Sequence, residues 1–564
     1  MRHFTSSVTR ALVLLALGAG FSPLAAQTGT ITGKVTAADS PTPLEAARVS
    51  IVGTGLSVNT NREGLYTLRG VTPGSVSVRV TALGFATAIK QVTVTANQAS
   101  ALDFVLVQAP YTLDEITITS TGDTRKRELG NSVNTIQVTS LSETAPVKNI
   151  SDVLKARAPG VQVFSSTGTI GAGQRIRIRG SNSVSLNNEP LVVVDGISYE
   201  AGTGSASFGV GGQGPSRFND LNPDEIADMQ ILKGPSAAAI YGTRGANGVV
   251  LITTRRGVAG RAKWSLWSEQ GTNTDKNPYP DNYFGASSAG TRCTLANVAA
   301  ATCTIATVSR FNPLRDPDQS PLGRGRRQQY GANVSGGSDL VQYFVSAERE
   351  SESGVFFMPK SEVTRIGDGS GRATLREDEI NPNNIDKVNV RSNFTAQLSP
   401  KSNIALNIGY VTSALRLPQN DNNVRGIHSS ALNGDGRGPT GPNGLVGTWG
   451  FFRPGETFQR LTSQTIQRLT TGTTANYNPF DWLTTRATIG LDLTSRVDQL
   501  LNRFGEGPNF SLDRVGIAAE GRRTIALYTI DYNATAAFKL SDRMESKTTA
   551  GVNYSQNNFR GTNA

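Results

Sequence analysis

Alternation of apolar and polar residues, repeated in one segment after another, is the feature of this sequence that most constrains its fold. Such segments fill the chain after Arg256 and include residues 388–398, 404–410, 487–493 and 528–538. A period of two places the apolar side chains of a strand on one face and the polar side chains on the other. We count about nine such strands before the sequence ends. The C-terminal half is therefore predicted to be a large antiparallel sheet with one apolar and one polar face.

The connections between these strands are unequal in length. Short turns alternate with long polar loops, and four aromatic residues lie beside the short turns. The short turns are predicted near Pro400, Pro479 and Asp542, and the aromatic residues are Tyr477, Phe480, Trp482 and Phe538. This asymmetry is typical of an outer-membrane β-barrel, which faces lipid with its apolar side and carries aromatic residues at the membrane interface. The alternative, a soluble sandwich with one wet face, does not explain the asymmetry.

The N-terminus has the composition of a secretory signal. A positive start (Arg2, His3 and Arg10) precedes an apolar run, residues 11–20, and small residues lead to a predicted cleavage site after Ala26. We therefore assign residues 1–26 to a signal peptide. Its apolar run is too short to span a membrane, and no later run approaches the ~20 apolar residues of a transmembrane helix. A membrane role would require a β-barrel.

The composition argues against several classes of function. The formal charge is +11, but Lys and Arg are scattered outside any nucleic-acid-binding motif, so no nucleic-acid partner is expected. His428 is the one histidine after the signal, which argues against a histidine metal site and a Ser-His-Asp triad. We predict a protein that is not an enzyme, with no catalytic, cofactor-binding or metal-binding residues. Cys293 and Cys303 are predicted to form a local disulfide, the alternative being two free thiols.

Residues 27–108 are predicted to form a small β-sandwich, because short alternating runs are separated by turn residues roughly every eight to twelve positions. The stretch resembles the carboxypeptidase-regulatory-like domain in its P-L-x-x-A-x-V pattern from Pro43 to Val49, in Asn61–Leu68 and in Gly84-Phe85. The resemblance implies an accessory domain. Nothing in it supplies zinc ligands or a general base, so an enzymatic reading is not supported.

A linker, residues 109–130, contains an acidic pair followed by alternating β-branched residues. These residues are Asp114, Glu115, Ile116, Thr117, Ile118 and Thr119. The segment resembles the TonB box, which pairs with the periplasmic domain of TonB by strand addition. The resemblance implies that these six residues contact TonB. The alternative is an ordinary edge strand of the neighbouring domain.

Residues 131–256 combine a helix with several short strands. Residues 151–163 predict a helix followed by a strand. Ser151 is the predicted cap of the helix, and Pro159 and Gly160 end it. Arg175–Gly180 alternates strictly, so its arginines share one face and its isoleucines the other. Pro190–Gly196 predicts a buried strand that ends in a turn.

A glycine-rich block, Ile231–Thr254, completes this region. Two short apolar strands, residues 229–232 and 249–252, enclose an alanine-rich turn of helix at residues 236–240. Glycines at this density permit positive φ and close packing of the backbone. No hydrolytic nucleophile lies in the block.

Together these elements resemble the plug domain of TonB-dependent outer-membrane transporters of the SusC/RagA-like family. Gly234-Pro235 departs from the Asp-Ala that SusC-like proteins often carry there, although plugs of TonB-dependent transporters in general do carry Gly-Pro. The residues that carry the plug signature are Arg179, Gly180, Pro190, Asp195, Gly196, Gly234, Tyr241, Gly242, Gly245, Asn247 and Gly248.

The resemblance implies a mainly β protein of three parts: a β-sandwich, an α+β plug at residues 131–256, and a transmembrane antiparallel β-barrel from residue 257. Because such barrels have about 22 strands, residues 257–564 are expected to be the N-terminal part of an incomplete barrel. The implied function is TonB-dependent uptake of a nutrient, an oligosaccharide or a peptide, across the outer membrane. The implied partners are TonB, a SusD-like surface lipoprotein, the nutrient and the lipid bilayer. A non-transporting outer-membrane receptor or adhesin is the alternative.

Overall fold

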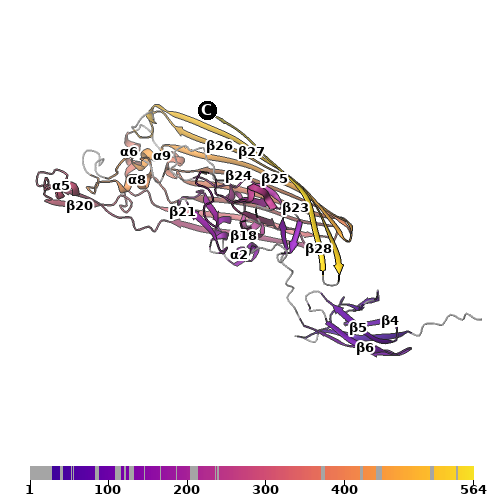
Figure 1. Cartoon of the computed structure of the whole chain (residues 1–564). Coiled ribbons are helices and arrows are strands. Elements are labelled where there is room, and N and C mark those ends of the chain that lie inside the picture. The colour runs from indigo at the N-terminus through magenta and orange to yellow at the C-terminus, as the bar shows by residue number, and fades with distance from the viewer. Residues whose placement is uncertain are drawn as a thin grey trace, which may run out of the picture. The chain divides into compact units, whose positions relative to one another are not determined.

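The chain divides into two compact units, Met1–Glu115 and Ile116–Ala564 (Figure 1). The computed structural model describes residues 28–38, 42–52, 54, 56–82, 85, 88–107, 116–119, 122–125, 133–144, 147–155, 157–165, 167–185, 187–202, 214–234, 237, 240–369, 375–419, 424–439, 448–508, 513–541 and 544–564. The predicted signal peptide lies outside the described residues.

The first unit is a sandwich of two small sheets, as the alternating runs predicted. Its strands are β1 (Gly29–Ala37), β2 (Arg48–Ile51), β3 (Ser57–Asn59), β4 (Leu65–Val71), β5 (Gly74–Thr81), β6 (Ala88–Val94), β7 (Ala99–Ala101) and β8 (Phe104–Leu106). One sheet has the order β4-β1-β7, with β8 also paired to β1, and the other has the order β3-β2-β5-β6. Val49, Val78 and Phe104 are completely buried between them. The core is thus made of the inward-facing residues of alternating strands.

The second unit begins with a two-stranded hairpin. Strand β9 (Ile116–Thr119) pairs antiparallel with β10 (Gly122–Arg125), and Thr117 lies opposite Thr124. The segment that resembles a TonB box therefore forms a strand over its last four residues, whereas Asp114 and Glu115 lie outside the described residues. Within the described part of the chain, β10 is the one strand paired with β9.

The domain that follows, which we call the plug, is built on a five-stranded sheet of order β11-β16-β17-β14-β15. These strands are β11 (Asn134–Gln137), β14 (Leu191–Val194), β15 (Ile197–Tyr199), β16 (Ile226–Leu232) and β17 (Val249–Thr254). A hairpin of β12 (Val161–Ser165) and β13 (Gln174–Ile178), the helices α2 (Val138–Thr144) and α3 (Ile150–Leu154), and the short 3-10 turns η2 (Arg217–Asp220), η3 (Pro223–Glu225) and η4 (Gly242–Gly245) surround it.

The local patterns predicted most of these elements. In β13, Ile176 and Ile178 are buried while Arg175 is exposed, and β14 ends at the predicted turn. The capping role of Ser151 was wrong: α3 begins at Ile150 with Asn149 at its N-cap, two residues before Ser151. Ser151 is completely buried inside the helix, and its hydroxyl donates to Asn219 Oδ1 at 2.9 Å. The helix shifts because Ile150 is itself a fully buried core residue.

The glycine-rich block joins two neighbouring strands of the plug sheet. Strands β16 and β17 lie antiparallel, with Ile231 opposite Val250. Gly248 has a φ of +90°, which L side chains rarely adopt. A Cβ on Gly245 would lie 2.5 Å from the Ala237 carbonyl oxygen, so close backbone packing explains this glycine. The predicted helical turn at residues 236–240 is described only at Ala237 and Ile240.

A nine-stranded antiparallel sheet, which we call the wall, forms the rest of the unit (Figure 1). Its strands pair in chain order and are β18 (Gly260–Thr274), β21 (Arg324–Gly337), β22 (Val341–Ser353), β23 (Asn384–Ser399), β24 (Ser402–Arg416), β25 (Leu461–Phe480), β26 (Leu483–Asn502), β27 (Ile517–Ser541) and β28 (Met544–Asn563). The number of strands agrees with the count made from the sequence. The wall is the predicted part of a barrel.

The wall exposes its apolar side chains and buries its polar ones, which is the reverse of a sheet in a soluble protein. The side chains on the outer face are apolar and exposed, for example Trp264 at 72%, Leu266 at 78% and Ile489 at 62%. On the inner face, Asp492 and Asp498 are at most 1% exposed. Apolar residues outward and polar residues inward are the arrangement of a transmembrane barrel.

The turns at the two ends of the wall also differ. Strands β23 and β24 are joined by a short turn at Pro400, and β25 and β26 by one near Pro479. Beside the latter turn, Trp482 stacks on Phe480 and on Phe538, with ring centroids 5.5 and 5.1 Å apart. The predicted turn at Asp542 lies outside the described residues.

The opposite end carries long loops with their own secondary structure. These elements are β19 (Asn282–Ala286), α5 (Leu295–Ala299), β20 (Thr307–Phe311), α6 (Lys360–Gly369), α7 (Glu377–Ile380), α8 (Ile427–Leu432), α9 (Pro454–Phe458) and η6 (Asp513–Val515). Strands β19 and β20 form a hairpin, and a disulfide joins Cys293 to Cys303 across its tip. Among the described helices, none has the length and apolar character needed to cross a membrane.

Removal of this disulfide is expected to loosen the β19–β20 loop without unfolding the wall. The bridge closes a short loop, and closing a loop of this size stabilises it by about 2–3 kcal/mol. In the variant Cys293→Ser/Cys303→Ser, limited proteolysis should cut between residues 286 and 307 several-fold faster, while the thermal unfolding of the wall stays unchanged. Equal cutting rates for variant and parent would contradict this prediction.

Candidate functional site

The plug contacts the inner, polar face of the wall, and this interface is the candidate site. Three groups of contacts account for most of it, and Arg244 also donates to Ser555 of β28. Two groups lie against strands β25 to β27, and the third lies against β22 to β24. The first and third groups pair charged or hydrogen-bonding residues of the wall with short segments of the plug, and the second is an apolar contact.

The first group surrounds Arg468 on β25, the largest fully buried side chain in the described residues. Its Nε and Nη2 donate to the two carboxylate oxygens of Asp492 on β26, at 2.8 and 2.6 Å. The same guanidinium reaches the plug: it donates to the Glu200 carbonyl at 2.8 Å and to Asp220 Oδ2 at 3.3 Å. It also lies 3.3 Å from the ring centroid of Tyr199. Two wall residues thus hold three plug residues around one buried cation.

The second group is an apolar contact, in which one plug side chain (the knob) fits a depression in the wall (the socket). Gly472 on β25 and Gly490 on β26 are directly opposite each other in the sheet, and together they leave a flat patch on the inner face. Ile197 of β15 fills it: a Cβ on Gly472 would lie 2.1 Å from Ile197 Cδ1, and one on Gly490 would lie 2.5 Å from its Cγ1. No residue except glycine leaves room for Ile197 at these two positions.

The backbone beside the knob is also tied to the wall. The Ser198 N–H donates to Thr529 Oγ1 on β27 at 3.1 Å, and the Glu200 N–H donates to Asp492 Oδ2 at 2.9 Å. The N–H of Ser198 in the edge strand β15 and that of Glu200 just after it are therefore satisfied by wall side chains. Burial raises the pKa of Tyr199, so its phenol stays neutral next to the guanidinium.

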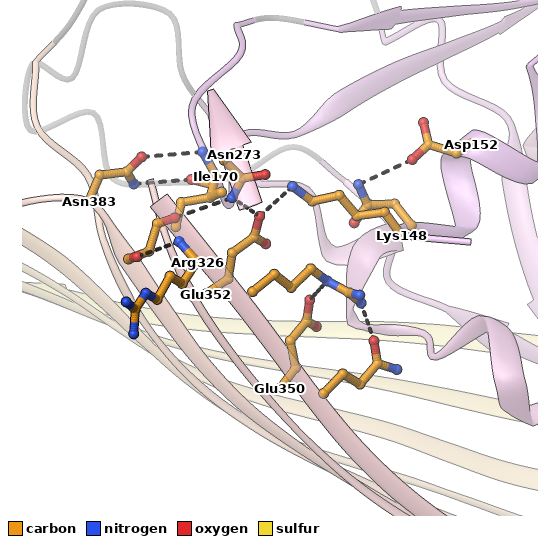
Figure 2. A network of polar contacts seen from close by, with 12 residues as sticks. Lys148, Asp152, Ile170, Asn273, Arg326, Glu350, Glu352 and Asn383 are labelled. Atoms are coloured by element: carbon orange, nitrogen blue, oxygen red, sulfur yellow. Dashed lines mark hydrogen bonds and ion pairs between the residues drawn. The ribbon is translucent and has the colours of Figure 1, made fainter. Parts of the chain in front are cut away.

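The third group connects the plug with strands β22 to β24. Arg391 donates through Nε to Glu225 Oε2 at 2.8 Å, and each side chain is 5% exposed. Farther along the plug, Lys148 reaches Glu352 of β22 at 2.5 Å (Figure 2). Asn273 of β18 donates to the same carboxylate at 2.8 Å. In Figure 2, Asn383 also bridges the plug backbone at Ile170, accepting from its N–H and donating to its carbonyl, both at 3.3 Å.

A cavity of about 230 Å³ lies within this third group. The plug supplies α3, the loop from residue 165 to 174 and η2, and the wall supplies β22, β23 and β24. Lys387 of β23 points into this region and pairs with Glu350 at 2.8 Å. The cavity is thus lined mainly by charged and polar groups, several of which pair with each other, beside the apolar Ile170, Ile385 and Leu415.

A second cavity, of about 340 Å³, lies where long loops of the wall meet the plug. Tyr279, Phe356 and His428 line it together with Asp275. The Tyr279 hydroxyl donates to Asp275 Oδ2 at 2.7 Å and lies 2.9 Å from His428 Nε2. The rings of Tyr279 and His428 stack with centroids 5.3 Å apart. Burial and the bond to Asp275 raise the pKa of Tyr279 to about 12.

The residues of the predicted plug signature lie inside the plug and shape its turns. Asp195 accepts from the Thr254 N–H at 3.0 Å and from its hydroxyl at 2.6 Å, which ties the hairpin turn to the end of β17. Asn247 donates to the Asn187 carbonyl at 2.8 Å. Gly180, Gly196, Gly234, Gly242 and Gly248 have positive φ, as does Arg179. Pro190 precedes β14, and Tyr241 and Gly245 pack in the block itself.

Sequence reasoning missed the residues that hold the plug to the wall. These are Arg391, Arg468, Gly472, Gly490 and Asp492 in the wall, and Ile197, Glu200, Asp220 and Glu225 in the plug. A signal for the wall residues was present, because each lies on the polar face of an alternating strand. The choice of partners depends on where the plug sits, and local patterns carry no information about that.

Replacing Gly490 by Ala is expected to push the plug away from its socket. The new methyl group would overlap Ile197, and overpacking of this kind costs about 1–3 kcal/mol. Limited proteolysis of the plug should be faster in Gly490→Ala than in the parent. Gly271→Ala is the matched control, because a Cβ there meets nothing closer than 3.7 Å. The prediction fails if the two variants behave alike.

Arg468→Met is expected to be more damaging than the double change Arg468→Met/Asp492→Asn. The single change leaves Asp492 without its cationic partner. Asp492 is completely buried, and an unpaired buried charge costs about 3–5 kcal/mol. The second change removes that charge while it keeps an acceptor oxygen for the Glu200 N–H. Denaturant midpoints of the detergent-solubilised variants measure the difference. A double variant no more stable than the single one would contradict the assignment.

Comparison with known families identifies both N-terminal domains. Residues 125–249 match the TonB-dependent Receptor Plug Domain. Residues 30–107 match the Carboxypeptidase regulatory-like domain. The two matches correspond to the plug and to the sandwich of the first unit.

Similar proteins extend the match into the wall. TonB-dependent receptor P26 of Formosa agariphila is 30% identical over 385 residues, which are 67% of this chain and 34% of that protein. TonB-dependent receptor SusC of Bacteroides thetaiotaomicron is 35% identical over 164 residues, which are 29% of this chain and 16% of SusC. The chain thus spans about a third of the length of P26 and less of SusC.

Solved structures show the same fold. The RagAB peptide importer in its open-open state superposes with a TM-score of 0.59 at 19% identity, covering 80% of this chain and 50% of the other. In the closed-closed state the TM-score is 0.56 at 20% identity, with 77% and 48% covered. The two domain matches, the related receptors and the shared fold together place this chain in the SusC/RagA-like family of TonB-dependent receptors.

Proposed function

We propose that this chain is part of a transporter that takes up a nutrient across the outer membrane, driven by TonB. The observation that carries the proposal is the polar interface between plug and wall. Hydrogen bonds and ion pairs such as Arg391 with Glu225 hold the plug, and apolar contacts such as that of Ile197 are the exception. Polar groups that separate can be rehydrated, so such an interface can open and close again, whereas a continuous apolar core cannot open cheaply.

TonB would act on the strand that precedes the plug. Residues Asp114–Thr119 resemble its binding segment, and β9 has an edge that β10 leaves unpaired in the described residues. Strand addition to that edge would make a continuous connection from TonB to the plug. Force applied there reaches the plug before it reaches the wall, because the chain enters the plug next.

The cavity at the loop end of the wall is the proposed site of first contact with the nutrient. Its stacked Tyr279 and His428 offer apolar ring surface, and Asp275 offers a hydrogen-bond acceptor. An oligosaccharide or a peptide presents both apolar faces and polar groups, and would fit such a lining. The relatives support this class of cargo, since RagAB is a peptide importer. A SusD-like surface lipoprotein is the proposed partner that covers this end.

A non-transporting outer-membrane receptor or adhesin is the alternative. It would use the same wall and loops but would not need a strand that TonB can pull. An enzymatic role has no support, because the related proteins are receptors and transporters.

Deletion of Asp114–Thr119 in the full-length receptor is expected to abolish both TonB pull-down and uptake. The matched control deletes six other residues, Lys126–Asn131 at the junction of linker and plug, which shortens the tether equally but keeps the strand. Uptake is measured as growth on the nutrient that induces the gene, and surface labelling confirms that both variants reach the membrane. Normal uptake after loss of the strand would favour the receptor or adhesin.

A further inference from the structure

The plug is held unequally on its two sides, and the difference indicates where it opens. Against β25 to β27 the contacts are dry and close. Arg468 and Asp492 are 1% and 0% exposed, and Ile197 fits a socket that only glycine permits. Separating the plug from the wall here would break a buried, bidentate ion pair and a close apolar contact at the same time.

Against β22 to β24 the contacts are mixed. The side chains of Arg391 and Glu225 are each 5% exposed, whereas the contacts at the cavity are looser. The side chain of Lys148 is 41% exposed, and an ion pair with one partly solvated member contributes little stability. The cavity removes packing contacts from the residues around it, which lose the dispersion attraction of a filled interface.

A buried guanidinium with one unsatisfied N–H lies beside the same cavity. Arg217 of η2 is 5% exposed and is among the lining residues. Its Nη2 donates to Gln464 at 2.9 Å and its Nη1 lies 3.3 Å from Asp220 Oδ1, but its Nε has no hydrogen-bond partner among the described residues. A buried donor that lacks a partner makes the closed arrangement less stable.

The lining of the cavity indicates what can enter. On the wall side it presents Glu350, Glu352, Lys387 and Ser413, and on the plug side Lys148 and Arg217. No aromatic residue lies among the described residues that line it. Charges that pair with each other give a neutral but strongly polar surface. Such a surface suits a hydrated molecule rich in hydroxyl or amide oxygens and disfavours an apolar one.

We propose that the plug opens at this cavity, between α3, residues 165–174 and strands β22 to β24, and that β15 stays docked in its socket as the fixed side. The cavity is then the first internal site for a polar cargo. This inference rests on the proposed TonB-dependent transport. It adds which side of the plug opens and which kind of molecule the opened space would accept.

Two serines make a matched test, because both are buried and each lies on one side. Ser413 of β24 lines the cavity and is 7% exposed, whereas Ser198 of β15 is beside the socket and is 6% exposed. Each is changed to Cys in the full-length receptor. Cys293 and Cys303 are joined to each other, so they do not compete, and the parent receptor measures the labelling of any other cysteine. Cells are treated with fluorescein maleimide, in strains with and without TonB, during growth on the inducing nutrient.

The expected result is a several-fold rise in labelling of Ser413→Cys when TonB is present, and no rise for Ser198→Cys. Thr169→Cys, on the plug side of the cavity, repeats the measurement should Ser413→Cys not reach the membrane. Equal labelling of both sides in the presence of TonB, or an unchanged Ser413→Cys, overturns the inference. Uptake is measured in the same strains. If uptake does not depend on TonB, the proposed function fails, whereas TonB-dependent uptake with equal labelling overturns the route of opening alone.

Discussion

The inward-facing polar residues of the wall are the constraint on which the rest of this structure depends. A strand that turns its apolar side chains outward must bury its polar ones, and each buried polar group needs a partner. The plug supplies many of these partners, and neighbouring wall residues supply others, as in the pair of Lys387 with Glu350. Arg468 shows how tightly the requirement is met, since Asp492, Asp220, the Glu200 carbonyl and the ring of Tyr199 surround one guanidinium. Wall and plug are therefore complementary in hydrogen bonding more than in hydrophobic surface.

Because the contacts are polar, the strength with which the wall holds the plug differs from one contact to the next. Where side chains exclude water, as around Asp492, the electrostatic attraction is strong and losing one partner is costly. Where water reaches the contact, as at Lys148, the same kind of ion pair contributes little. A domain with both kinds of contact can yield on one side while it stays attached on the other, since the least stable parts of a fold open first.

Much of the fold could be predicted from the sequence, because strands and turns leave local patterns. The alternation in residues 487–493 gave both the strand β26 and the face of each residue. The glycine pair of the socket left a signal too, since Gly472 and Gly490 lie equally far from Asp481, in the turn that joins β25 and β26. The ion pair between Glu225 and Arg391 was not within reach, because no local pattern relates residues 166 positions apart. The start of α3 was misplaced because a buried serine resembles a capping serine in sequence.

The socket also bears on how the molecule is assembled. Glycine weakens a strand, since it has no side chain to pack and a large conformational freedom to lose. At Gly472 and Gly490 the inner face of the wall lacks side-chain volume, and Ile197 of the plug supplies it. Strands β25 and β26 are thus complete only when the plug is in place. The two domains would then mature in step, with the folded plug acting as a template on which this part of the wall acquires its final shape.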